Sequence, residues 1–287
     1  MLHAFTIDLE EWFCSHNLQA AVKPSDRNRL PLRAAAPTCR LLEMLEKRGI
    51  KATFFVLGQL AEQLPDLVRD IQKAGHEIAS HGYAHLLTTQ HTPGTFAEDL
   101  IKAGSAIQDC TGIIPDLFRA PAFSITPATL WALDVLKQQG FRADSSVFPL
   151  SWHPDYGMPD APLLPYKHDN GLLEFPMSVV EMGGKRWPVS GGAYFRMLPF
   201  GVYERLIRRL EKQGRPLLFY LHPWELDPGM PRLPGLSRMA RFRHYAFLET
   251  VERKLNLLLQ NFEFAPLGVV FNQPCNTPTG GVSPNLP

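Results

Sequence analysis

The sequence predicts an α/β fold with a mainly parallel sheet, and three observations support this. Short apolar runs rich in strand-forming residues alternate along the chain with stretches whose apolar side chains recur at helical spacing. Glycine follows several of the helical stretches, where a helix would end. Polar and titratable side chains stand at the ends of several expected strands. Alternating strands and helices favour a parallel sheet with helices outside it, although periodicity does not decide whether the sheet closes into a barrel.

The expected strands are short and apolar. The run LHAFTIDL (2–9) is rich in strand formers and ends at an acid, and PLLFYLH (216–222) is very apolar and ends at a histidine. In chain order, the expected strands are 2–9, 51–58, 76–80, 117–121, 141–147, 172–179, 216–222 and 267–271.

The expected helices are amphipathic and have recognisable ends. Three of them are followed by a glycine, and Thr95 is the expected N-cap of another because Glu98 follows three residues later. We expect loops at 149–170, over the active face, and at 223–236, and a glycine-opened connection at 190–197. In chain order, the expected helices are 32–47, 60–73, 95–110, 126–139, 202–213 and 245–262.

Length and charge bound the functional class. With 287 residues the chain is long enough for one large domain, expected over 1–272, and the tail 273–287, rich in Pro, Asn, Thr, Gly and Ser, is expected to be disordered. The 29 basic and 28 acidic side chains give a net charge of +1 and form no long run of one sign, so nothing indicates a nucleic-acid partner. The 4 cysteines have no regular spacing and are expected to be reduced thiols.

The first residues carry acids rather than an apolar stretch. MLHAFTIDLEEW holds several carboxylates before any long apolar run, so it indicates neither a secretory signal nor a membrane span. We therefore expect a cytoplasmic protein. The sequence leaves the oligomeric state open.

Two histidines follow the third expected strand. In GHEIASHGYAH (75–85), His81 and His85 can turn toward one point and offer ring nitrogens to a single divalent ion at about 2.0–2.1 Å. By itself such a pair is more often packing or a capped surface. The strand before it, and the acids Asp8 and Glu10 at the N-terminus, favour a metal site whose third ligand comes from the first strand.

These motifs occur in the order found in a known family. TIDLE, KATFFVLG, GHEIASHGYAH, FRAPAF, ADSS and LFYLH follow one another over roughly residues 4–222. With these segments the sequence resembles the polysaccharide deacetylases, the NodB-homology or carbohydrate esterase family 4 enzymes. The chain from about residue 223, including FRHYAFLETVERKLNLLLQNFEF, further resembles the subgroup encoded with bacterial exopolysaccharide export and exosortase systems.

The resemblance implies a fold, a metal and a base. The fold would be a distorted (β/α)7-type barrel holding one divalent ion, most often Zn²⁺, with Co²⁺, Ni²⁺ or Mn²⁺ as alternatives. His81 and His85 would bind it, and Asp8 would be the general base that takes a proton from the attacking water. Arg119 would pair with Asp8 through two parallel hydrogen bonds, which a lysine could not form.

The resemblance also implies an acid and an oxyanion donor. His222 would protonate the leaving amine, Asp144 would hold the His222 ring, and the backbone N–H near Ala122 would stabilise the tetrahedral oxyanion. The residues alone leave other interpretations open. His222 could be a core histidine, and Asp144 could form an Asx turn.

The sequence departs from the family pattern in three places. Leu9 stands where a second aspartate is common. Glu10 is the expected third metal ligand, because alternate residues of a strand face the same side, with a water or Asp8 itself as alternatives. Ala122 replaces the usual tyrosine. No tryptophan follows Asp144 at the expected spacing, so the apolar wall for the substrate's acetyl methyl would come from Phe123, Trp152 or Trp224.

The leading hypothesis is a metal-dependent hydrolase that removes N-acetyl groups from N-acetylhexosamine units of an exopolysaccharide or its precursor. One alternative is another C–N amide hydrolase on the same fold, acting on a cyclic imide, a ureide or peptidoglycan. A second is a catalytically silent carbohydrate-binding scaffold. A serine hydrolase is disfavoured because the sequence has no GxSxG motif.

Overall fold

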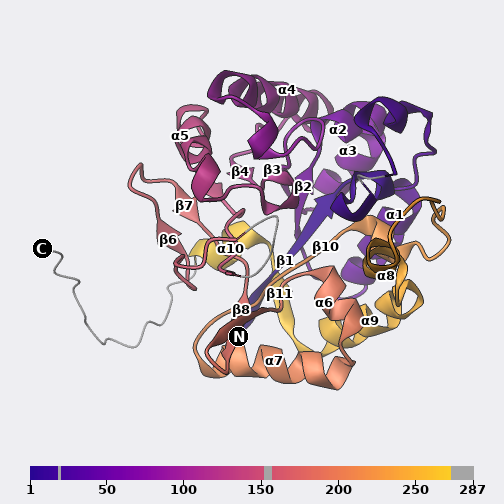
Figure 1. Cartoon of the computed structure of the whole chain (residues 1–287), viewed down its shortest axis with the longest axis vertical. Helices are drawn as coiled ribbons and strands as arrows, with labels where there is room; N and C mark the ends of the chain where they lie inside the picture. The colour runs from indigo at the N-terminus through magenta and orange to yellow at the C-terminus, as the bar shows by residue number, and fades with distance from the viewer. Residues whose placement is uncertain (19–20, 152–156, 273–287) are drawn as a thin grey trace, which may run out of the picture.

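The computed structural model describes residues 1–18, 21–151 and 157–272. It shows a curled, mostly parallel sheet with helices packed around its outside (Figure 1). The strands of this sheet are β1 (Leu2–Leu9), β2 (Thr53–Val56), β3 (Glu77–Ser80), β4 (Leu117–Phe118), β5 (Ala143–Asp144), β6 (Tyr166–Lys167), β7 (Leu173–Glu174), β10 (Leu218–Leu221) and β11 (Glu263–Ala265). The helices are α1 (Ala35–Glu46), α2 (Gly58–Gln63), α3 (Pro65–Lys73), α4 (Pro93–Thr111), α5 (Trp131–Gln138), α6 (Gly192–Met197), α7 (Phe200–Lys212), α8 (Arg238–Tyr245), α9 (Val251–Asn261) and α10 (Leu267–Asn272).

The α/β fold is confirmed, and the barrel takes the form of an incompletely closed, curled sheet. The strands follow the order β10-β1-β2-β3-β4-β5-β7-β6, with parallel pairing from β10 to β7 and an antiparallel β6. In the described residues β10 and β7 do not pair. The backbone N–H of Leu218 instead donates to Ser178 Oγ at 2.9 Å, and that of Tyr220 to the Ser190 carbonyl at 2.9 Å.

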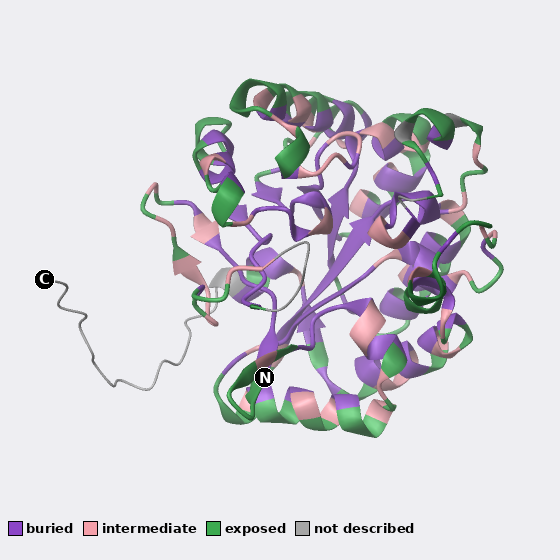
Figure 2. Ribbon diagram, viewed as in Figure 1, coloured by how far each residue is buried: buried purple, intermediate pink, exposed green. Residues whose placement is uncertain are grey.

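Strand β1 sets the inside and the outside of this sheet. Phe5, Ile7 and Leu9 belong to the large apolar cluster under the outer helices, whereas Ala4 belongs to the inner cluster. The alternation of a strand therefore directs Asp8, two residues before Glu10, into the interior. Both faces of β1 are buried, as Figure 2 shows for the strands around it. Helices cover the outer face, as is usual for parallel strands.

The prediction of a strand at 267–271 is wrong, because this segment forms helix α10. Its β-branched residues favour a strand in isolation, but the folded chain supplies acceptors for the first turn of a helix. The Leu267 N–H donates to Thr53 Oγ1 at 2.7 Å and the Gly268 N–H to Glu77 Oε2 at 3.0 Å. The last strand is β11, which pairs with the start of β1.

Two helix boundaries also differ from the prediction. The helix expected over 60–73 is two helices, α2 and α3, because Pro65 disfavours the helical conformation at Leu64, which has φ −131°. The N-cap of α4 is Thr92 rather than Thr95, and its side chain accepts a hydrogen bond from the Thr95 N–H at 3.3 Å.

The second half of the chain holds more regular structure than expected. The connection expected at 190–197 contains α6, and a β-hairpin of β8 (Val179–Met182) and β9 (Lys185–Pro188) precedes it. The helix expected over 245–262 is α9, preceded by a separate helix α8. Both missed helices, α6 and α8, contribute side chains to the cavity described next.

Candidate active site

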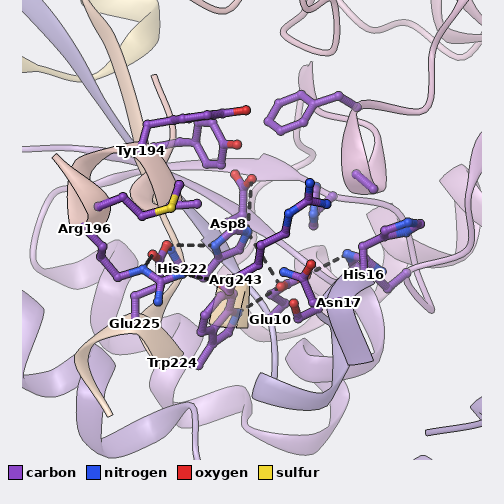
Figure 3. A pocket seen from close by; sticks show the side chains of 18 residues that line it. Asp8, Glu10, His16, Asn17, Tyr194, Arg196, His222, Trp224, Glu225 and Arg243 are labelled. Atoms are coloured by element: carbon purple, nitrogen blue, oxygen red, sulfur yellow. Dashed lines mark hydrogen bonds and ion pairs between the residues drawn. The ribbon is translucent and has the colours of Figure 1, made fainter. Parts of the chain in front are cut away.

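A cavity of about 370 Å³ opens at the carboxyl ends of β1, β3 and β10. Parallel strands end at the same edge of a sheet, so the residues that follow them converge there. Figure 3 shows side chains from the N-terminal strand, including Asp8 and Glu10, close to His222 and Glu225 from the second half of the chain. The cavity is thus built jointly by the two halves of the sequence.

Glu10, His81 and His85 form a group that can hold a metal ion. One potential ligand atom from each lies within 4.8 Å of the others, and all three side chains are buried. Glu10 Oε2 is 2.7 Å from His85 Nε2. Three nitrogen and oxygen donors at such separations suit Zn²⁺, which binds them at about 2.0–2.2 Å. The structure therefore brings together the three residues that the sequence predicts as ligands.

The surroundings of these residues fit a bound cation. His81 Nδ1 lies 2.8 Å from the Arg119 carbonyl oxygen, and donation to this oxygen leaves Nε2 to coordinate an ion. Burial lowers the pKa of His81 to about 4, which gives the neutral imidazole that a metal requires. Among the described residues, the buried atom His85 Nδ1 has no hydrogen-bond partner, and buried polar atoms of this kind are uncommon in folded proteins.

The Glu10 carboxylate is held between several groups. Burial acts to raise its pKa, but the imidazoles of His85 and His222 outweigh burial and lower the pKa well below its usual range. The indole of Trp224 donates a hydrogen bond to Glu10 Oε1 at 3.1 Å. Glu10 is therefore a candidate metal ligand in its ionised form, and its Oε1 atom is oriented by Trp224.

Asp8 lies beside the metal-ligand group and is fixed by Arg119. The Arg119 guanidinium is fully buried and donates to Asp8 Oδ1 at 2.6 Å and to Thr6 Oγ1 at 2.9 Å through the same nitrogen. Its other nitrogens donate to the carbonyl and hydroxyl oxygens of Ser145. The predicted pair is present, but it uses one guanidinium nitrogen rather than two. Asp8 Oδ2 points toward His222 Nε2, at 4.0 Å.

His222 is oriented by Glu225, not by Asp144. The Nδ1 atom of His222 is 3.0 Å from Glu225 Oε1, which also accepts the His222 backbone N–H at 3.1 Å. The ring stacks on Trp224 with centroids 4.9 Å apart. Burial acts to lower the pKa of His222, but Glu10, Glu225 and Asp8 together raise it to about 9. The site thus favours an imidazolium at this position.

Glu225 is itself held by a buried arginine. Arg196 Nε is 2.8 Å from Glu225 Oε2, and both side chains are almost completely inaccessible to solvent. The other Arg196 nitrogens donate to the carbonyl oxygens of Arg243, His244 and Ala246 at 3.0–3.1 Å. Burial acts to raise the pKa of Glu225, but Arg196 and His222 keep it below the usual range. A chain of charges therefore runs from His222 into the protein interior.

Asp144 belongs to a different buried pair. Its Oδ1 accepts a hydrogen bond from Ser146 Oγ at 2.6 Å, and its neighbour on the adjacent strand is Glu174. Burial first, and then Glu174, raise the pKa of Asp144 well above its usual range, and burial raises that of Glu174 to about 7. Two carboxyl groups this close favour a protonated form. The predicted role of Asp144 at the His222 ring is therefore incorrect.

Three of the four predicted substrate-contacting residues line the cavity. Ala122, Phe123 and Trp224 do so, and the Phe123 ring packs on Tyr220 with centroids 4.9 Å apart. Trp152 lies outside the described residues. Ala122 and Phe123 have φ of 50° and 54°, and His85 has φ of 54°. Non-glycine residues rarely adopt this left-handed conformation, and such strain concentrates at functional sites.

Sequence reasoning missed the residues that support His222. Glu225 stands three residues after His222, and the motif HPWE carries the spacing of a helix-capping carboxylate, which could have indicated it. Arg196 had no such signal, because its partner is fixed only by the tertiary fold. Gly192 is required beside it, since a Cβ there would lie 2.1 Å from Glu225 Oε1.

The comparisons with protein families divide the chain into two parts. Residues 33–143 match the polysaccharide deacetylase family model, and residues 145–272 match a domain of unknown function, DUF3473. Residues 33–143 therefore resemble a polysaccharide deacetylase domain of the NodB and carbohydrate esterase family 4 type. His222, Glu225 and Arg196 all lie in the DUF3473 part.

Curated relatives point to the same family. The chain is 28% identical over 120 residues to a peptidoglycan-N-acetylglucosamine deacetylase of Bacillus cereus, covering 38% of this chain and 44% of that protein. It is 37% identical over 144 residues to a peptidoglycan deacetylase-like protein of Gibberella zeae, covering 50% of this chain and 38% of the relative. The match thus spans less than half the length of each of these two relatives.

A solved structure supports the fold. A Mycobacterium smegmatis protein described as a candidate polysaccharide deacetylase superposes with a TM-score of 0.58 at 21% identity, covering 99% of this chain and 96% of that one. At this identity the likeness concerns the fold. Among the described residues, no helix combines the length and apolar character needed to cross a bilayer.

Proposed function

We propose that this protein is a metal-dependent deacetylase that removes acetyl groups from N-acetylhexosamine units of an exopolysaccharide or its precursor. The observation that carries the proposal is the arrangement around the cavity. A candidate metal group of Glu10, His81 and His85 lies next to the carboxylate of Asp8, and the imidazole of His222 lies 4.0 Å from Asp8 Oδ2. Hydrolysis of an amide needs a base for the water and an acid for the leaving amine, and Asp8 and His222 would supply them.

The ligand group would hold one divalent ion, which we propose to be Zn²⁺ and which when bound would polarise the amide carbonyl and lower the pKa of water. Asp8 would take a proton from the attacking water through Oδ2, because Oδ1 is bonded to Arg119. Arg119 thereby positions the base. Its own geometry is fixed by Ser145 and by the Phe55 ring, whose centroid lies 4.1 Å from the guanidinium carbon.

His222 would deliver a proton from Nε2 to the leaving nitrogen. Its Nδ1 is engaged by Glu225, so Nε2 is the ring nitrogen available to a substrate. The aromatic side chains of Phe123 and Tyr220 line the cavity and would pack against the acetyl methyl group. The backbone N–H near Ala122 remains the candidate donor to the oxyanion.

A test measures metal content and acetate release on the same preparation of the full chain. We expect about one equivalent of metal per chain by mass spectrometry, acetate release from N-acetylglucosamine oligomers, loss of both on chelation, and recovery when Zn²⁺ is added. His81→Ala should lose the metal. His91→Ala changes a half-buried histidine that does not line the cavity, and this matched control should retain metal and activity.

Two results would overturn the proposal. Hydrolysis of a cyclic imide with none of N-acetylated glycans would indicate another C–N hydrolase. A stoichiometric metal without turnover of any N-acetylated glycan would indicate a binding scaffold.

A further inference from the structure

Helix α8 and the turn after it expose large apolar side chains, and Figure 2 colours much of α8 as exposed. Met239 is 60% exposed, Phe242 50% and Phe247 42%, and the rings of Phe242 and Phe247 pack edge to face with centroids 6.2 Å apart. Single exposed apolar residues are ordinary, but three within nine residues form a patch. We call these three side chains, with Arg238 and Arg241, the α8 face.

The α8 face is strongly basic. The segment SRMARFRHYAFLE (237–249) contains three arginines and one acid, whereas the whole chain has a net charge of only +1. Arg238, Arg241 and Arg243 are all exposed. A short helix that mixes exposed arginines with exposed Phe and Met is typical of segments that lie in the interface of an anionic membrane.

The backbone of the α8 face is strained. Phe247 has φ 61° and ψ 18°. The other described non-glycine residues with positive φ are His85, Ala122 and Phe123, and all three line the cavity. Such strain persists only where the surrounding structure enforces it, and it concentrates at functional positions. Here the left-handed residue carries an aromatic side chain that is 42% exposed.

The helix is also held rigidly beside the cavity. Tyr245 is buried, and its hydroxyl donates to the Pro231 carbonyl at 3.0 Å and accepts from the Leu233 N–H at 3.1 Å. Arg196 donates to the carbonyl oxygen of His244. Arg243, from the same helix, lines the cavity (Figure 3). Helix α8 therefore borders the cavity through Arg243 and is fixed to the side of the site that holds His222.

From these observations we propose that the α8 face binds the surface of an anionic phospholipid membrane. Met239, Phe242 and Phe247 would enter the boundary between headgroups and acyl chains, and Arg238 and Arg241 would contact lipid phosphates. Negative surface charge is the complement to this concentration of arginines. The binding itself does not require the deacetylase reaction. Where both hold, the cavity mouth faces a glycan that is attached to lipid.

The test is cosedimentation of the full chain with vesicles of phosphatidylcholine alone or with phosphatidylglycerol added. We expect binding to the anionic vesicles only, weakened by high salt. Arg238→Gln combined with Arg241→Gln should lower the partition coefficient about 30-fold, since each basic residue near the surface contributes about fivefold. Met239→Ser combined with Phe242→Ser should lower it at least tenfold. The matched control is Ile101→Ser with Lys137→Gln, which changes exposed residues on α4 and α5 and should bind as the parent does.

The outcomes separate this proposal from the catalytic one. The α8 variants should release acetate from soluble oligosaccharides at the parent rate, because none of the four substituted residues lines the cavity. Absence of vesicle binding in the parent, or equal loss in the control, would overturn the membrane proposal. So would a dimer in sedimentation velocity that the α8 variants dissociate, because the α8 face would then bind a second copy of the chain.

Discussion

The two sides of the cavity are built in different ways. One side, which we call the metal side, is formed by residues on parallel strands or within five residues of their ends: Asp8, Glu10, His81, His85 and Arg119. On the other, His222 follows a strand, but Glu225 and Arg196 fix it through a buried ion pair and hydrogen bonds to α8. The metal ligands are positioned by backbone pairing, and on their side only Asp8 is held by an ion pair. The acid side, which is His222 with Glu225 and Arg196, is positioned by charge pairing throughout. The acid side should therefore be the more sensitive to single changes away from the reacting groups.

The largest expected effect is on the metal side. Asp8→Asn removes the candidate base and leaves the three metal ligands in place. We expect acetate release to fall about 10³-fold, within the range that a general base contributes, with unchanged metal content. Steady-state rates and metal analysis of the same sample measure this. Asp109→Asn, an exposed carboxylate on α4, should change neither. A variant that keeps more than a tenth of the parent rate would remove Asp8 from the mechanism.

The next effect distinguishes the acid side from the metal side. Glu225→Gln leaves His222 present but removes the charge at its Nδ1, so kcat on N-acetylated glycans should fall about 10-fold to 100-fold. An aryl acetate has a leaving group that needs no proton. Its hydrolysis should therefore be nearly unchanged in Glu225→Gln and strongly reduced in Asp8→Asn.

Comparing the glycan with the aryl acetate also shows which result would contradict this role of Glu225. Equal losses on the glycan and on the aryl acetate would mean that Glu225 supports the structure of the whole cavity rather than the acid. Glu225→Asp should recover part of the glycan activity, because it restores the carboxylate, whereas a purely steric role would not be restored by the shorter side chain.

A smaller effect is expected from crowding the acid side. A Cβ at Gly192 would lie 2.1 Å from Glu225 Oε1, so Gly192→Ala must displace that carboxylate. We expect glycan turnover to fall about tenfold and the midpoint of thermal unfolding to drop by a few degrees, as overpacking costs about 1–3 kcal/mol. Gly201→Ala is the control, because a Cβ there meets no atom within 4 Å and lies in helix α7. Calorimetry and steady-state kinetics compare the two glycine variants. Equal unfolding midpoints and equal turnover in both would refute the displacement of Glu225 by a Cβ at Gly192.

The difference between the metal side and the acid side also explains how much of the site the sequence could predict. His81 and His85 lie in one short motif after one strand, so local pattern was enough to place them together. Glu10 followed from strand alternation, because β1 keeps Asp8 and Glu10 on the inner side. Both inferences depend on regular geometry, which a sequence displays directly.

The acid side could not be predicted in this way. Arg196 contacts Glu225 only because α6 packs against the segment after β10. No local sequence pattern predicts an ion pair between two separate elements. Asp144 was assigned to His222 by family order, whereas the fold places it beside Glu174. The prediction of a strand at 267–271 was wrong for a related reason. The first turn of helix α10 is stabilised by Thr53 and Glu77, which lie far away in the sequence.

The smallest expected effect on activity, and the final test of the comparison, is Asp144→Asn. In the described part of the chain Asp144 accepts a hydrogen bond from Ser146, and His222 Nδ1 contacts Glu225 rather than Asp144, so glycan turnover should fall far less than in Glu225→Gln. Its effect should appear in stability instead. Burial and Glu174 raise the pKa of Asp144, and burial raises the pKa of Glu174 to about 7, whereas unfolded carboxyl groups titrate near about 4.

Between these values the folded protein binds more protons than the unfolded chain, so the free energy of unfolding decreases as pH rises from about 4 to about 7. Asparagine cannot ionise and removes the like charge next to Glu174, so the slope of the unfolding midpoint against pH should become shallower in Asp144→Asn. Thermal unfolding between pH 5 and pH 8 measures this, with Asp109→Asn as the control of unchanged slope. An unchanged slope together with a selective loss of glycan turnover would return Asp144 to the acid side, because the carboxyl pair would then not explain its burial.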